Sequence, residues 1–169
     1  SIAIFILFCK IGEYMNNSTS YWLKKGIHNG MPIALGYLAV SFTLGIAAKN
    51  AGLTALQAAL ASITCHASAG EFAGFTLIAA LAAYTEIAVM ELIINARYFL
   101  MSCALSQKLD NKMPFFHRLI MGLFVTDEIF GLTVSVPEKL NPAYMYGMVL
   151  VASPAWVLGT YFGVLFGNI

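Results

Sequence analysis

Charged residues are scarce in this sequence. Asp, Glu, Lys and Arg make up 10% of the 169 residues, whereas about 25% is usual in soluble domains. Hydrophobic residues make up 60%, so the composition predicts an integral membrane protein whose surroundings are a lipid bilayer. The net charge of +1 offers no basic surface for nucleic acid, and we expect no nucleic-acid partner.

Cysteine is rare as well, and recognisable catalytic motifs are missing. Cys9, Cys65 and Cys103 lie far apart in apolar sequence, which argues against a disulfide framework or a CxxC metal site. There is no GxSxG, no HExxH and no phosphate-binding glycine loop. We therefore expect no enzymatic activity, no cofactor, no metal and no ATP-driven pump within this chain.

Four apolar segments are long enough to cross a bilayer, which takes about 20 residues. They are 31–48, 87–106, 119–136 and 143–167. Residues 1–30 are predicted to form a cytoplasmic N-terminal segment, and 31–169 a transmembrane domain. Pro32 suits the first turn of the first helix, where a missing N–H costs nothing. Pro154 lies inside the last span, where a kink is expected.

A fifth apolar segment, residues 54–84, is too long for one ordinary span and too short for two. Lysines and arginines gather before residue 31 (Lys10, Lys24, Lys25) and between 107 and 118 (Lys108, Lys112, Arg118). The positive-inside rule places both groups in the cytoplasm. This requires that 54–84 enter and return as two half-helices meeting near "CHASAG". Lys49 and Lys139 are then outside. The alternative is one long tilted helix.

The expected fold is therefore all-α, with four full spans and one re-entrant segment at 54–84. Irregular backbone inside a membrane is tolerated only where protein or a water-filled cavity covers it. Ionisable residues inside spans cost about 2.5–3.5 kcal/mol each and by default mark a pathway or a site. Here they are Glu71, Glu91, Arg97, Asp127 and Glu128, with His66 beside them.

Helical geometry indicates which of these residues can meet. Glu91 and Arg97 are six residues apart, about 240° around a helix, so Arg97 needs a counter-ion on another segment. Glu71 and Asp127 are the candidates. Glu91 instead shares one helix face with Asn95, Tyr98 and Ser102. It is interpreted either as an interfacial anchor or as part of a pathway.

Four carboxylates and one arginine cannot all stay charged in a low-dielectric interior, so at least one carboxyl is expected to be protonated near neutral pH. Glu71, Asp127 and Glu128 are the candidates for a proton carrier. His66 is interpreted as a hydrogen-bonding partner of a freed carbonyl rather than a metal ligand. Gly70 and Gly74 serve either close helix packing or a substrate path.

Several stretches together resemble one family. They are "KKGIHNGMPIALGYLAVSFTLGIAAKNAGLTALQAALASIT", "AGEFAG", "NARYFLMSCALSQKL" and "GLFVTDEIFGL". In this order and spacing they resemble the AzlC family, the large subunit of branched-chain amino-acid exporters. The resemblance covers residues 24–160. Family positions map onto Gly30, Pro32, Gly36, 67–71, 95–97 and 126–128.

The resemblance implies a multi-pass protein of the bacterial inner membrane with a transporter domain at 31–169. Its substrates would be hydrophobic amino acids, its driving force the proton gradient, and its partner a small AzlD-like membrane subunit. The expected substrate-binding or proton-coupling residues are His66, Ser68, Gly70, Glu71, Asn95, Arg97, Asp127 and Glu128. The half-helix ends at 62–75 would bind the amino acid. A non-transporting structural or regulatory subunit is the alternative, and a channel-like pore is a third.

Two departures from the family pattern stand out. Family members commonly read Asn-Phe-Ala-Gly-Ala-Ser-Gln-Phe where this chain reads Cys-His-Ala-Ser-Ala-Gly-Glu-Phe at 65–72. Glu71 and His66 are thus the positions where its chemistry is expected to differ. Members are also usually longer, with further apolar spans. Without those spans, a sealed pathway is expected to need the partner subunit or a second copy of the chain.

Overall fold

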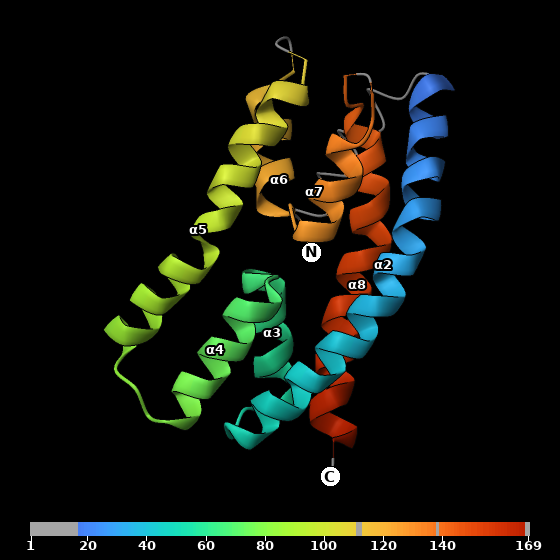
Figure 1. Cartoon of the computed structure of the whole chain (residues 1–169). Coiled ribbons are helices and arrows are strands. Elements are labelled where there is room, and N and C mark those ends of the chain that lie inside the picture. The colour runs from blue at the N-terminus through green and yellow to red at the C-terminus, as the bar shows by residue number, and fades with distance from the viewer. Residues whose placement is uncertain (1–16, 111–112, 138, 168–169) are drawn as a thin grey trace.

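The computed structural model describes residues 17–110, 113–137 and 139–167, and this part of the chain is all-helical (Figure 1). The first 16 residues of the expected segment 1–30, with Cys9 and Lys10, lie outside the described residues, and so does Lys112. The helices are α2 (Asn17–Asn50), α3 (Ala55–Cys65), α4 (Ser68–Ala79), α5 (Tyr84–Lys108), α6 (Phe115–Leu123), α7 (Asp127–Val134) and α8 (Pro142–Phe166).

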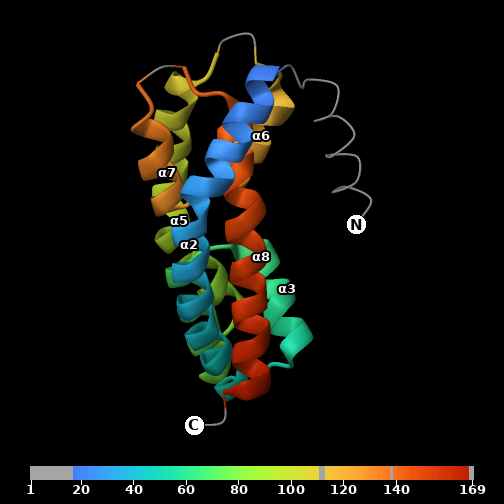
Figure 2. The same cartoon turned by 90° about the vertical axis from the view of Figure 1, so that its right-hand side faces the viewer.

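Three of the described helices, α2, α5 and α8, are long and apolar enough to cross a membrane. α2 and α8 lie side by side along their length (Figure 2). Glycines permit this approach, since a Cβ on Gly45 would come within 2.7 Å of the Gly163 Cα. Close contact through small residues is typical of membrane helices, because moving apolar side chains from lipid into a helix–helix contact gains little free energy. The pair forms the scaffold for the remaining helices.

The expected break in 54–84 is present. α3 begins at a Thr54–Gln57 capping box and ends at His66, whose φ of 48° is left-handed. Ala67 is extended and α4 starts at Ser68. Figure 1 shows α3 rising from the lower end of the molecule and α4 returning to it. Residues 54–84 therefore form a hairpin of two half-helices, and the alternative of one long helix is wrong.

The predicted full span at 119–136 is wrong. The chain forms a second hairpin there, in which α6 descends from the upper end and α7 returns to it (Figure 1). The break lies at Phe124–Thr126, where Thr126 is extended and its hydroxyl accepts a hydrogen bond from the Ile129 N–H. A threonine N-cap followed by Asp127 and Glu128 starts a new helix, because acceptors and negative charge stabilise a helix N-terminus. The described fold thus has three helices long and apolar enough to span a membrane and two hairpins.

The second hairpin changes the side assigned to Lys139. The Leu140 N–H donates to the Lys108 carbonyl at 3.0 Å, and the Lys139 ammonium donates to the Gln107 and Leu109 carbonyls, each at 3.4 Å. Lys139 therefore lies at the same end as Lys108, and the prediction that it faces the outside with Lys49 is wrong.

Pro32 does not lie in a first turn, because helix α2 begins at Asn17 and Pro32 falls inside it. Its ring removes the hydrogen bond to the His28 carbonyl, and α2 bends part-way along its length in Figure 1. Pro154 lies inside α8, as expected.

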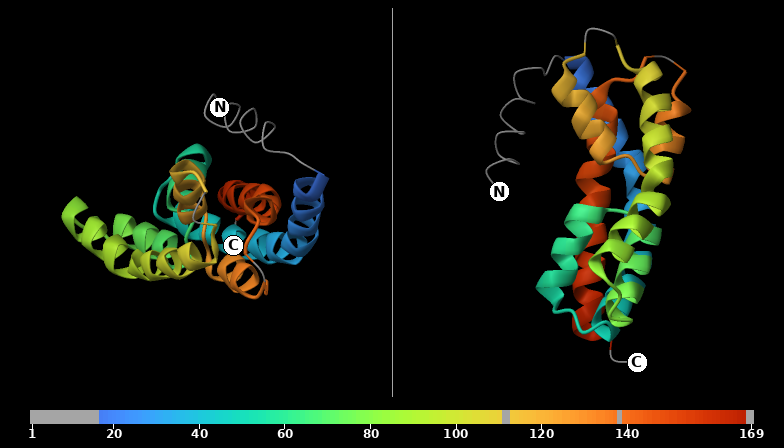
Figure 3. Two further views of the ribbon diagram at one scale, coloured as in Figure 1. Left: turned by 90° about the horizontal axis from the view of Figure 1, so that it is seen from above. Right: turned by 90° about the vertical axis from the view of Figure 1, so that its left-hand side faces the viewer.

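The two hairpins meet half-way along the long helices. Seen from above, both lie between α5 and the α2–α8 pair, and α3 and α6 are stacked one over the other (Figure 3). The rings of His66 in the first turn-around and Phe124 in the second are 5.9 Å apart between centroids. The hairpins enter from opposite ends of the protein, and their non-helical turns meet at the same level along the long helices.

Candidate functional site

A cavity of about 540 Å³ lies where the first hairpin, helix α5 and the end of α6 come together. Its polar lining comes from the side chains of Thr64, Cys65, His66, Glu71, Glu91, Asn95 and Tyr98. The rest is apolar and includes Phe75, Ile78, Ile87, Leu123 and Val125. An apolar wall with a few convergent polar groups is typical of small-molecule sites.

Glu91 projects from α5 into this cavity. Its Oε2 accepts a hydrogen bond from the Asn95 amide at 2.8 Å and lies 3.7 Å from the Cys65 sulfur. Two glycines of α4 make room for the carboxylate. A Cβ on Gly70 would lie 2.7 Å from Oε2, and one on Gly74 would lie 3.0 Å from Oε1.

Glu71 is buried on the other side of α4, with 2% of its surface exposed. Its Oε1 accepts from the Trp156 indole N–H and its Oε2 from the Ser62 hydroxyl, both at 2.6 Å. The Ser62 hydroxyl also lies 2.8 Å from the Thr160 hydroxyl on α8. Glu71 is thus fixed between the hairpin and the scaffold, away from Arg97.

His66 fills the junction between the hairpins and α8. Its Nε2 lies 3.2 Å from the Ser153 hydroxyl, and its ring packs edge-on against Phe124 and Trp156. The hydrogen bond goes to a side-chain hydroxyl rather than to the freed carbonyl that the sequence predicted. Within the described residues, no group of three or more His, Cys, Asp or Glu side chains could hold a metal ion.

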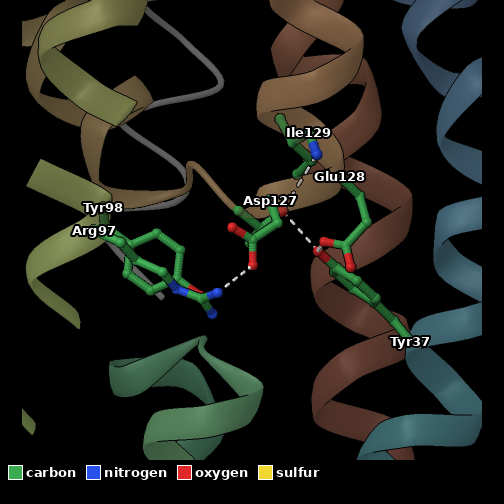
Figure 4. Close-up of polar contacts among 7 residues, drawn as sticks. Tyr37, Arg97, Tyr98, Asp127, Glu128 and Ile129 are labelled. Carbon is green, nitrogen blue, oxygen red and sulfur yellow. Dashed lines mark hydrogen bonds and ion pairs between the residues drawn. The ribbon is translucent and has the colours of Figure 1, made fainter. Parts of the chain in front are cut away.

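Arg97 and Asp127 form an ion pair of 2.9 Å between α5 and the start of α7 (Figure 4). Of the two predicted counter-ions, Asp127 is therefore the one found. Both side chains are almost half exposed, at 43% and 49%. The Arg97 guanidinium also donates to the Tyr98 hydroxyl at 3.2 Å, which links the pair to the rim of the cavity.

Tyr37 connects the second hairpin to the scaffold. Its hydroxyl hydrogen-bonds Thr126 Oγ1 and Glu128 Oε2, each at 2.6 Å, and Figure 4 shows it reaching from α2 toward the α7 N-terminus. Tyr37 was not among the predicted site residues. A tyrosine in a long apolar helix gave no signal, because its partner lies about 90 residues further on.

The predicted site residues divide into three places. Glu71, His66 and Asn95 line the cavity, with Gly70 against Glu91. Arg97, Asp127 and Glu128 gather at the start of α7. Ser68 is exposed at the start of α4 and does not line the cavity. Glu91 was not among the predicted site residues, although its face shared with Asn95 and Tyr98 pointed to it.

The sequence model described as "AzlC protein" matches residues 32–169. The chain belongs to the AzlC family. An uncharacterized membrane protein of Archaeoglobus fulgidus is 34% identical over 151 residues, which cover 89% of this chain and 65% of that protein. Inner membrane protein YgaZ of Escherichia coli K12 is 22% identical over 148 residues, covering 85% of this chain and 60% of YgaZ.

An uncharacterized membrane protein of Helicobacter pylori J99 is 26% identical over 151 residues, covering 86% of this chain and 64% of the relative. The chain thus spans a little under two thirds of the length of the curated relatives it matches. No solved structure matches it. Membership in the AzlC family and three long apolar helices identify a membrane protein.

Proposed function

We propose that this AzlC-family chain is the large subunit of a secondary transporter that exports branched-chain or other hydrophobic amino acids by proton antiport. One observation carries the proposal: an apolar-walled cavity with a carboxylate lies where two half-helix hairpins from opposite ends of the protein meet. Broken helices at mid-depth form the substrate sites of other transporters. A small AzlD-like membrane subunit completes the pathway.

The orientation follows from charge. Lys24, Lys25, Lys108 and Lys139 gather at one end of the described residues, whereas Lys49 lies at the other. The positive-inside rule then assigns the lysine-rich end, with the start of α2, to the cytoplasm. We assign the chain to the inner membrane, the location that the name of the relative YgaZ gives for that protein.

The side chain and the carboxylate of the amino-acid substrate are assigned to different parts of the site. Phe75, Ile78 and Ile87 provide an apolar wall for a branched side chain. The N-cap of α4, Ala67, has no side chain that accepts a hydrogen bond from the first turn. The N–H groups of that turn, favoured by the helix dipole, are assigned to the substrate's carboxylate.

Glu71 is assigned as the proton carrier in preference to Asp127, which is paired with Arg97. Its partners suit both protonation states. When Glu71 is charged, Ser62 donates to it. When Glu71 is protonated, it donates to the Ser62 hydroxyl, and the Ser62 hydroxyl donates to the Thr160 hydroxyl instead. The Thr160 hydroxyl then donates to the Trp156 carbonyl, 3.3 Å away.

The test is efflux from cells that express the chain with its AzlD-like partner and are loaded with leucine-containing dipeptides. Faster release of leucine than in cells without the chain, with a rate that depends on the imposed pH gradient, is the expected result. Release that is fast but indifferent to pH would indicate a pore. No increase in release would favour a non-transporting subunit and refute the proposal.

A further inference from the structure

Glu91 differs from the other carboxyl groups of the hairpin region in having no fixed set of partners. Glu71 accepts from Ser62 and Trp156, and Asp127 is paired with Arg97. Glu91 Oε2 is held by one amide and a distant thiol, while no hydrogen bond to Oε1 is found among the described residues. A carboxylate on a cavity wall with one open oxygen is a site for a cationic or N–H-bearing ligand.

A second observation points the same way. The Oδ1 atom of Asn95 is buried and has no hydrogen-bond partner in the described structure, although its amide group donates to Glu91 at 2.8 Å. Buried acceptors are nearly always satisfied in folded proteins. An unsatisfied amide oxygen on the residue that holds Oε2 of Glu91 therefore indicates that a hydrogen-bond donor is missing next to this carboxylate.

The wall opposite Glu91 leaves room for its carboxylate. Gly70 and Gly74 face the carboxylate, and a Cβ at either position would lie 2.7 Å or 3.0 Å from its oxygens. No lysine or arginine lines the cavity among the described residues. Glu91 therefore has no cationic partner among the described residues.

We propose that Glu91 and Asn95 bind the ammonium group of the transported compound, an inference that rests on the proposed function for the rest of the ligand. An ammonium has three N–H donors and no acceptor, which matches the open Oε1 of Glu91 and the unpaired Oδ1 of Asn95. Its apolar side chain would lie toward Phe75, Ile78 and Ile87, which line the same cavity. The α4 N-terminus would then hold only the carboxylate.

The experiment measures equilibrium binding of labelled L-leucine to the purified complex. Two competitors are 3-methylbutylamine, which has the ammonium but no carboxylate, and 4-methylpentanoate, which has the carboxylate but no ammonium. Because Gln keeps the shape and loses the charge, Glu91→Gln should weaken binding of leucine and of the amine by about tenfold or more, and leave 4-methylpentanoate within about twofold. Glu86→Gln, on the same helix outside the cavity lining, is the matched control.

Leucine affinity of Glu91→Gln within about twofold of the unmodified protein would overturn the assignment while leaving the export proposal intact. Binding of the amine without binding or export of leucine would support the ammonium site and refute amino-acid export. Binding of none of the three compounds to the unmodified protein would overturn both.

A second variant covers the case in which Glu91→Gln does not fold. Gly74→Ala keeps every charge but places a methyl group against Oε1 of Glu91, and should weaken leucine binding about threefold or more. Gly36→Ala is its control, because a Cβ there meets nothing within 4 Å. Equal affinities of the two glycine variants would count against the role of Glu91.

Discussion

The two hairpins use the same backbone device in different chemical surroundings. In both, a half-helix ends, an extended residue follows, and a second half-helix starts with a carboxylate in its first turn. Glu71 of the first hairpin is buried between neutral donors on α3 and α8. Asp127 of the second is almost half exposed and meets a cation on α5.

This difference suggests separate tasks for the two carboxylates. A buried carboxyl with neutral partners can gain and lose a proton without losing an ion pair, whereas protonation of a carboxylate paired with arginine breaks the pair. The first hairpin thus suits proton coupling. The second suits attachment of α7 to α5.

The largest effect is expected from breaking the ion pair of the second hairpin. Arg97→Leu leaves Asp127 without its cation, at a cost of about 3 kcal/mol, or roughly 100-fold in the folding equilibrium. The fraction of protein that stays monodisperse after heating in detergent measures this loss. Arg97→Leu combined with Asp127→Asn should recover most of it, and a double variant as unstable as the single one would contradict the pairing.

Removing a donor from the first hairpin should cost less. Trp156→Phe keeps an aromatic ring beside Tyr37 and His66 but leaves Oε1 of Glu71 buried without its N–H, at about 1–3 kcal/mol. Thermal unfolding in detergent measures the difference. In a Glu71→Leu background, where no acceptor remains, the same substitution should cost less. Equal costs in both backgrounds would contradict a direct bond.

Tyr37→Phe should weaken the second hairpin by about 0.5–1.5 kcal/mol, because it removes the hydroxyl shared by Thr126 and Glu128. The midpoint temperature of thermal unfolding and the rate of leucine export should both fall modestly. Tyr161→Phe on α8, which removes a different tyrosine hydroxyl, is the control. A Tyr37→Phe protein as stable and active as this control would show that the link is not needed.

Glu71→Gln should have the smallest effect on stability, because the Gln carbonyl can still accept from Trp156 and its amide can donate to Ser62. Its effect should lie in coupling, since an amide does not titrate. Leucine export measured at a series of pH values is expected to lose its pH dependence while expression stays unchanged. An unaltered pH profile would contradict the proton-carrying role.

Segment length and loop charge were enough to predict the first hairpin. Residues 54–84 do not fit one or two spans, and the lysine clusters required an even number of crossings. The second hairpin was missed because 119–136 has the length and apolarity of an ordinary span. Its signal was local: Thr126, Asp127 and Glu128 together form a helix start in the middle of that segment.

The site was predictable only in part. Depth and spacing identified Arg97, Asp127 and the face that carries Glu91 and Asn95. Which side of α4 faces α5 is decided by packing, so the sequence could not assign Gly70 and Gly74 to Glu91, or Trp156 to Glu71. Such contacts join residues far apart in the chain, and no local pattern marks them.

The central structural feature of the protein is a pair of hairpins that enter from opposite ends. Single cysteines at Thr54, Tyr84, Lys108 and Lys139, in a background without Cys9, Cys65 and Cys103, can be labelled in intact cells with a membrane-impermeant maleimide. Positions 54 and 84 should be labelled from outside, and positions 108 and 139 only after the membrane is opened. Labelling of positions 54 and 84 from different sides, or of positions 108 and 139 from different sides, would contradict the two-hairpin topology.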